Sequence, residues 1–176
     1  MNAEQVFQIV LRVLHIASGV FWVGTAWFFF GWIEPTTKAI GPQAGPFMHH
    51  VVRNRRVVRA IVGAGAVNVV VGLILYWRAS AGLNPAWIGS GMGIGFTLGG
   101  IAALVAWILG LTIIGPTVER LDEAGTAMAS AGRPPTPDEL GRFHGLEARL
   151  HRAGQADSLL LATAVLFMAA SRYLGG

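Results

Sequence analysis

The sequence contains no cysteine and few charged side chains. The absence of cysteine among its 176 residues excludes disulfide bonds, thiolate metal sites and iron–sulfur clusters. Charged residues make up 12% of the chain, 53% of the residues are hydrophobic, and the mean hydropathy is +0.56. An average soluble domain carries about 25% charged residues. The charge is too low to cover a water-soluble fold of this size, so the composition predicts an integral membrane protein.

Long runs without Asp, Glu, Lys or Arg divide the chain. They cover residues 13–31, 60–77, 79–118 and 158–171. A helix needs roughly 20 apolar residues to cross about 30 Å of hydrocarbon, so each run supplies one crossing, and the prolines fall between these crossings. We therefore expect an all-α integral membrane protein with one domain, residues 1–176. The predicted architecture is an antiparallel four-helix transmembrane bundle, with helices at about 5–33, 47–78, 90–116 and 138–174.

Lysine and arginine predict how the bundle lies in the membrane. Of these 13 residues, ten flank the first and third connections and three lie on the other side. Cytoplasmic loops carry an excess of Lys and Arg, so we expect loops one and three in the cytoplasm and both termini outside, in a bacterial inner membrane. The basic residues flank apolar segments, which indicates contact with lipid and not with nucleic acid. Glu4 and the lack of a basic residue before Arg12 make a signal peptide the weaker interpretation of the first span.

Small residues recur on one face of two predicted helices. Gly95 and Gly99 are spaced by four, and Gly65, Asn68 and Gly72 form a stripe on the second helix. Such stripes let membrane helices approach closely. Asn68 lies near the middle of the membrane, where a polar side chain needs a partner. We expect that partner on another helix.

The first helix carries the most specific candidate site. Arg12, His15, Gly19 and Trp22 follow intervals of 3, 4 and 3 and so share one face. An imidazole inside the membrane is costly unless it is paired or bound to a metal. Two interpretations stay open: His15 binds a haem iron while Arg12 contacts a propionate, or His15 is neutral and bonds a neighbouring helix while Arg12 reaches the headgroups.

Four further histidines lie near the predicted cytoplasmic side. His49 and His50 begin the second helix, and His144 and His151 lie on one face of the fourth. The last two are two turns, or about 10 Å, apart, too far to bind one metal together. A pairing of His49 or His50 with His144 or His151 is geometrically allowed, and ordinary solvated histidines are the alternative.

Depth separates these candidates into two tiers. His15 lies about 28 Å above the cytoplasmic boundary at 1.5 Å per residue, at a level where Met92, Met168 and Tyr173 are candidate second ligands. The sequence thus allows an outer site at His15 and an inner site built from the other histidines, holding one or two b-type haems. Asp157 lies just inside the fourth span, and the sequence leaves open whether it pairs with an arginine or takes up protons.

The segment from Arg12 to Gly24 resembles the first membrane helix of a known family. Its pattern of Arg12, His15, Gly19, Trp22 and Gly24, followed by an aromatic run, resembles the membrane domain of cytochrome-linked (PuuD-type) urate oxidases and the copper-resistance protein D-like membrane proteins. The resemblance covers about 30 of the 176 residues. It implies a helical membrane domain in a respiratory or redox context. The chain has no Cys-x-x-Cys-His segment for a c-type haem.

These patterns predict a b-type haem protein that transfers electrons between quinone and a redox partner protein. The chain shows no nucleophile elbow, phosphate loop or His-Glu-x-x-His motif, so an electron-transfer subunit is favoured over a stand-alone enzyme. One alternative is a protein that transports or handles copper or another metal, with ligands from His15, His50, His151, Met92 and Met168. The other is a cofactor-free membrane anchor or structural subunit. Its partners would be the lipid bilayer and a larger complex or a second copy of the chain.

Overall fold

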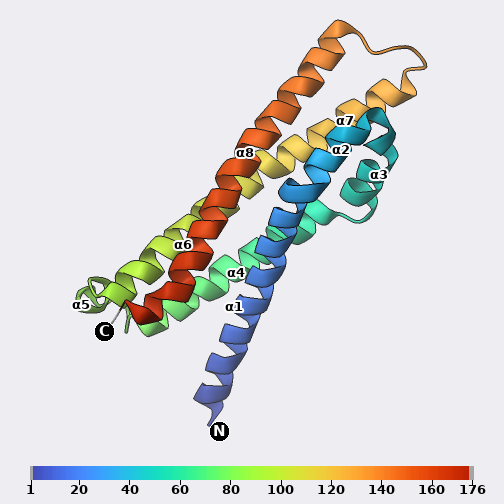
Figure 1. Ribbon diagram of the computed structural model, residues 1–176. Coiled ribbons are helices and arrows are strands. Elements are labelled where there is room, and N and C mark those ends of the chain that lie inside the picture. Colours follow the sequence, from blue (N-terminus) through green and yellow to red (C-terminus); the bar gives the residue numbers. More distant parts are fainter. Residues whose placement is uncertain (1, 175–176) are drawn as a thin grey trace.

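The protein is all-helical, and its four long helical segments pack antiparallel (Figure 1). The computed structural model describes residues 2–174. Each segment contains a stretch long and apolar enough to cross a bilayer. The segments that contain these stretches are Ala3–Asn54, Val57–Ala79, Gly91–Ser130 and Pro137–Tyr173. The predicted fold class, an antiparallel four-helix bundle with four candidate membrane spans, is confirmed.

The first segment begins with a capped helix and ends in several short ones. α1 (Ala3–Phe28) starts after Asn2, whose side chain accepts a hydrogen bond from the amide of Gln5 while Gln5 accepts one from the amide of Asn2. It continues through a π-helical turn, η1 (Phe29–Ile33), into α2 (Glu34–Ile40). The connection to the second span consists of the elements η2 (Gly41–Ala44), α3 (Gly45–His49) and η3 (His50–Asn54).

The second span starts later than the sequence predicts. We expected it from residue 47, but α4 (Val57–Ala79) begins at Val57. Arg56 adopts a left-handed conformation with φ of 51°. A residue in that conformation interrupts a right-handed helix, so the residues before it form separate short helices. The short helix α5 (Pro85–Ile88) follows in the second connection.

The third span continues past its predicted end at 116. α6 (Gly91–Leu109) is capped by Ser90 and passes through a π-helical turn, η4 (Gly110–Ile114), into α7 (Gly115–Ser130). Pro116 therefore lies inside a continuous helical segment, although a proline in a helix interior normally kinks or breaks it. The π-helical turn precedes Pro116 directly and alters the backbone register there. α1 reaches α2 in the same way, with η1 preceding Pro35.

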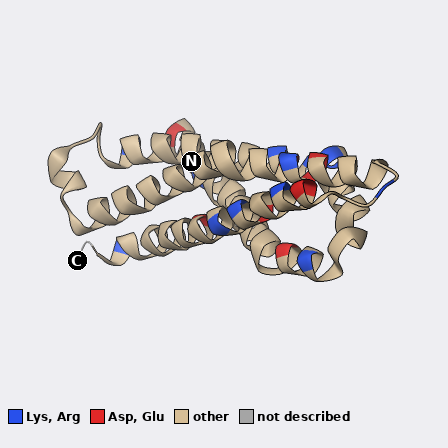
Figure 2. Cartoon of the chain, turned by 90° about the horizontal axis from the view of Figure 1, so that it is seen from above, with Lys and Arg blue, Asp and Glu red and all other residues tan. Residues whose placement is uncertain are grey.

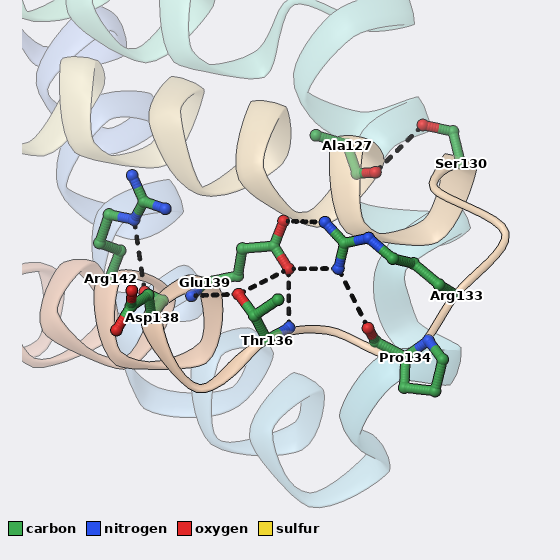
Figure 3. A network of polar contacts seen from close by, with 8 residues as sticks. All are labelled: Ala127, Ser130, Arg133, Pro134, Thr136, Asp138, Glu139 and Arg142. Carbon is green, nitrogen blue, oxygen red and sulfur yellow. Dashed lines mark hydrogen bonds and ion pairs between the residues drawn. The ribbon is translucent and has the colours of Figure 1, made fainter.

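The fourth segment is the longest single helix. α8 (Pro137–Ala170) begins at the predicted cap, Thr136, and is followed by η5 (Ser171–Tyr173). Glu139 accepts hydrogen bonds from Arg133 at 2.8 and 2.9 Å and from the amide of Thr136 at 2.7 Å (Figure 3). These contacts, the one with Arg133 first, lower the pKa of the partly exposed Glu139 to about 2. The capping contacts stabilise the start of α8 outside the membrane-spanning part.

The bundle consists of two helical hairpins. α1 packs on α4, α6 packs on α8, and the contact between α4 and α6 joins the two pairs. Between α6 and α8 the expected small-residue contact is present, because a Cβ added at Gly99 would lie 3.2 Å from the Cβ of Phe167. The centre of the bundle is a cluster of the buried residues Trp22, Ala26, Ala106 and Leu161.

Charged residues gather toward one end of the bundle (Figure 2). This end, which we call the charged end, holds α2, α3, α7 and the first turns of α8 (Figure 1). At this end Arg53 donates to Asp122 on α7 at 2.8 Å and to Glu123 at 2.7 Å. The opposite end holds the start of α1, the end of α8 and α5, and we call it the termini end.

Candidate functional site

A carboxyl group is buried inside the bundle beside a cavity. The side chain belongs to Asp157 on α8, which is 3% exposed. Its Oδ1 atom is buried and has no hydrogen-bond partner among residues 2–174. The cavity has a volume of about 60 Å³. Apart from Asp157, the residues that line it are Trp22, Ala26, Phe29, Phe30, Val57, Val58, Ile61, Val62, Trp107, Gly110, Ile114, Gly115 and Val118.

The inward face of α8 places this carboxyl at the centre. Its buried residues include Leu150, Gly154, Asp157, Leu161 and Ala164, at intervals of 4, 3, 4 and 3. This is the helical period of a face packed against neighbouring helices. An apolar residue would satisfy the pattern at position 157. The carboxyl therefore occupies a core position where it gives no packing advantage over a hydrophobic side chain.

An unpaired ionised carboxylate is unstable in such surroundings. Moving an isolated charge into an apolar interior costs tens of kcal/mol by idealised solvation, and real sites avoid this by neutralising the group or pairing it. No Lys or Arg lines the cavity. The site can therefore hold the neutral acid, and it can hold the carboxylate only with compensating water or a cation. A cavity of about 60 Å³ has room for on the order of four water molecules.

Both π-helical turns border the cavity. Phe29 and Phe30 belong to η1, and Gly110 and Ile114 belong to η4. π-helical turns are rare and occur frequently at functional sites, because they disrupt the regular backbone hydrogen bonds of the helix. The two irregular turns on α1–α2 and α6–α7 thus lie beside the buried carboxyl.

Two tryptophans close the cavity toward the termini end. A Cβ added at Gly65 would lie 2.7 Å from Cδ1 of Trp107 and 3.0 Å from Cε2 of Trp22, so only glycine leaves room for both rings. The indole nitrogen of Trp107 donates to the carbonyl of Val62 at 3.1 Å. The rings are fixed by these contacts, and Trp22, a predicted site residue, packs against α4.

His15 forms a reciprocal pair of hydrogen bonds with α4. Its Nδ1 lies 3.0 Å from the carbonyl oxygen of Asn68, and the side-chain amide of Asn68 donates to the carbonyl of His15 at 2.7 Å. Glycines allow this approach, because a Cβ at Gly72 would lie 2.9 Å from Cε1 of His15 and one at Gly19 would lie 2.8 Å from Nδ2 of Asn68. The expected partner of Asn68 on another helix is confirmed. Arg12, one turn away, is exposed.

The other predicted histidines have carboxylate partners or lie at the surface. Nδ1 of His49 is 3.0 Å from Oδ1 of Asp122, and Nδ1 of His151 is 3.1 Å from Oε1 of Glu34. Each of these two imidazoles contacts a carboxylate where the sequence allowed a second imidazole. His50 and His144 are exposed.

The methionines suggested as ligands lie on the second hairpin. The Met168 methyl group packs near Gly99, whose added Cβ would be 3.4 Å from it, and Met92 lies in the first turn of α6. Within residues 2–174, no three His, Asp or Glu side chains are grouped closely enough to hold a metal ion. The described contacts of His15 are with α4, whereas those of Met168 are with α6.

Two features of the site were not predicted from the sequence. Asp157 was noted there, but its lack of a partner depends on three other helices and leaves no local signal. Glu34, which is 6% exposed and contacts both Lys38 and His151, was not among the predicted site residues. The signal that the sequence offered for Glu34 was an acidic residue next to Pro35, where a helix junction is expected. Comparison with protein-family models, curated proteins and solved structures finds no match to this chain.

Proposed function

We propose that this chain transfers protons within the membrane, with Asp157 as the group that binds and releases them. The observation that supports this proposal is the buried, unpartnered carboxyl beside a cavity at the centre of the bundle. Ionisable groups inside membrane spans are rare and typically mark proton or ion pathways. In this proposal the charged end lies on the cytoplasmic side, because cytoplasmic loops carry an excess of Lys and Arg.

A proton suits the cavity better than a metal cation does. Hard cations require about six oxygen ligands, whereas the cavity lining supplies only one carboxyl group among side chains that are otherwise apolar. A proton needs a single acceptor oxygen. The proposed cycle is therefore uptake of one proton by the Asp157 carboxylate to give the neutral acid, followed by release of the same proton.

The test is proton flux in proteoliposomes. The purified protein is reconstituted with a pH-sensitive dye inside, a potassium gradient is applied with valinomycin, and acidification is recorded. We expect wild-type flux to exceed that of Asp157→Asn by about a hundredfold, which is at the low end of what one positioned proton-transfer group contributes. Thr163→Ala, at an exposed position on the same helix, serves as a control for protein loading and leak. Wild-type flux at the level of empty liposomes, or equal flux in Asp157→Asn, would refute the proposal.

Haem-linked electron transfer is the second candidate, because of the geometry of His15. Metal-bound imidazoles usually donate from one ring nitrogen to a carbonyl and bind the metal through the other. In this arrangement His15 would use Nδ1 for the carbonyl of Asn68, and its Nε2 would hold the haem iron. The haem would supply one-electron chemistry, with quinone and a redox protein as its partners. The hydrogen bonds to Asn68 also meet the polar needs of His15 without iron, so this candidate ranks second.

An absorption spectrum distinguishes the two candidates. Under the haem proposal, protein expressed with haem supplementation shows a Soret band, and reduction by dithionite shifts it. His15→Ala should remove that band, and His144→Ala, at an exposed position, should keep it. A spectrum without a Soret band eliminates the haem proposal and leaves the proton proposal intact. If both tests fail, the cofactor-free membrane anchor remains.

A further inference from the structure

A second hollow lies beside the Asp157 cavity, nearer the charged end. It is an open groove of about 640 Å³ between the first segment and α8. The groove contains ionisable and polar groups, in contrast to the apolar cavity. Its lining residues are Trp27, Phe30, Gly31, Glu34, His151, Gly154, Gln155, Ser158 and Leu159.

The ionisable groups of this groove form one contact network. Oε1 of the buried Glu34 is 3.1 Å from Nδ1 of His151 and 2.5 Å from Nζ of Lys38. His151 is exposed, so it contacts water on one side and the buried carboxylate on the other. Imidazole is the side chain that ordinarily gains and loses a proton between about pH 5 and 8. The network can therefore exchange protons with the aqueous phase.

One aromatic side chain lines both the groove and the cavity. Phe30 lines both hollows. Its ring lies against Gly154 so closely that a Cβ added at that position would overlap it. Gly154 lies one helical turn before Asp157, and both residues are buried on the inward face of α8. We call the Phe30 ring over Gly154 the partition, because Phe30 is shared by the two sets of lining residues.

We propose that the Glu34–His151 pair supplies protons to Asp157 and that the Phe30 ring over Gly154 controls their passage. This inference rests on the proposed function of Asp157. His151 and Asp157 are six residues apart on α8, or about 9 Å along its axis, which roughly three hydrogen-bonded water molecules span. A proton leaves the imidazolium of His151, passes along this water and protonates the Asp157 carboxylate. The imidazole then regains a proton from the aqueous side.

The polar and ionisable groups of the groove provide a route for this transfer. The described ionisable groups at the groove are Glu34 and Lys38 on α2 and His151 on α8. The contact with the Glu34 carboxylate holds the His151 ring at the groove. Gln155 and Ser158, which follow His151 at intervals of four and three residues, line the groove on the same face of α8. They supply polar groups that can bind water between the network and the partition.

The first test is proton flux in variants of the network. His151→Gln and Glu34→Gln should each lower proteoliposome flux at least about tenfold and reduce its dependence on pH, because the exchanging group is removed. His144→Gln, an exposed histidine two turns away on α8, should behave as the wild type. Equal flux and equal pH profiles in all three variants would refute the role of the Glu34–His151 pair.

The second test measures access to Asp157 independently of flux. A carbodiimide reacts with protonated carboxyl groups, and mass spectrometry of the peptide that contains Asp157 gives the labelling rate. Phe30→Ala should accelerate labelling from water and raise proton flux, and the more conservative Phe30→Leu should do so less. Phe28→Ala is the matched control, because Phe28 is 56% exposed and lines neither hollow. Circular dichroism verifies that each variant is folded.

The outcomes separate the two levels of the proposal. If Asp157→Asn conducts as well as the wild type, the function itself is wrong. If Asp157→Asn abolishes flux while the Phe30, Glu34 and His151 variants match their controls, Asp157 is the proton site and this route is wrong. Labelling rates that are equal in Phe30→Ala and Phe28→Ala refute the partition even where flux has changed.

Discussion

Replacement of Asp157 by leucine should make the protein more stable. Leucine has the same branched shape as aspartate, with two methyl groups in place of the two oxygens. The carboxyl loses its hydration on folding and gains no partner for Oδ1 among the described residues. An unsatisfied buried polar group costs about 1 to 3 kcal/mol, and replacing such a group by an apolar one of similar shape removes that cost. We expect Asp157→Leu to raise the free energy of unfolding by about 1 to 3 kcal/mol.

Unfolding in mixed micelles, followed by circular dichroism during titration with sodium dodecyl sulfate, measures this change. Asp157→Asn keeps the size and polarity of the side chain, so it should gain much less. Gln155→Leu, at an exposed position one turn away on α8, should change stability by no more than about 0.5 kcal/mol. A loss of stability in both Asp157 variants would mean that the carboxyl has a favourable partner, and the inference of an unpaired acid would then be wrong. A gain in stability together with lost proton flux is the exchange of stability for activity that functional sites often show.

Three further predictions concern packing, pH and topology. Gly65→Ala should lower the free energy of unfolding by about 1 to 3 kcal/mol because its methyl group meets two indole rings. Gly63→Ala, with open space at its Cβ, should raise the free energy of unfolding by up to about 1 kcal/mol. Similar values for both variants would contradict the packing described around Gly65. The lowered pKa of Glu139, about 2, means that its contacts stabilise the start of α8 above about pH 4.5 and are lost as the pH falls toward 2. Amide exchange of the first turn of α8, corrected for intrinsic rates, should rise over that range, and Glu139→Gln should show little such pH dependence. Because the chain contains no cysteine, a maleimide labels only a cysteine that is introduced. An impermeant maleimide applied to intact cells should label Ala81→Cys and spare Ala131→Cys. The reverse labelling pattern would mean that the orientation in the membrane is opposite to the predicted one.

The four spans could be predicted because the signal for a membrane helix is local. Charge-free runs long enough to cross hydrocarbon are visible in any window of the sequence. The residues at which the helices end were harder to predict from the sequence. Pro116 marks a plausible end, and only the π-helical turn before it lets the helix continue to Ser130. Such turns have no simple composition, so the sequence predicted the number and order of the spans better than their limits.

The candidate site was predicted only in part, because its chemistry depends on contacts between helices. The spacing predicted a shared face for His15 and Trp22, and both residues contact α4, where the partner of His15 is a backbone carbonyl. Every residue supplies a carbonyl, so no residue type identifies such a partner. Asp157 poses the opposite problem, since its distinguishing property is the partner it lacks. That property emerges only when all four segments are placed together.

The arrangement into two hairpins also affects how the protein is made. The contacts between α1 and α4 involve only residues that precede α6 in the chain, including the paired bonds of His15 and Asn68. Because synthesis proceeds from the amino terminus, this pair can assemble while the rest is still being translated. The helix with the costly acid is synthesised after the other three spans, which are then already present to surround it. Asp157 thus need not face bare lipid, where a lone acidic side chain is poorly tolerated.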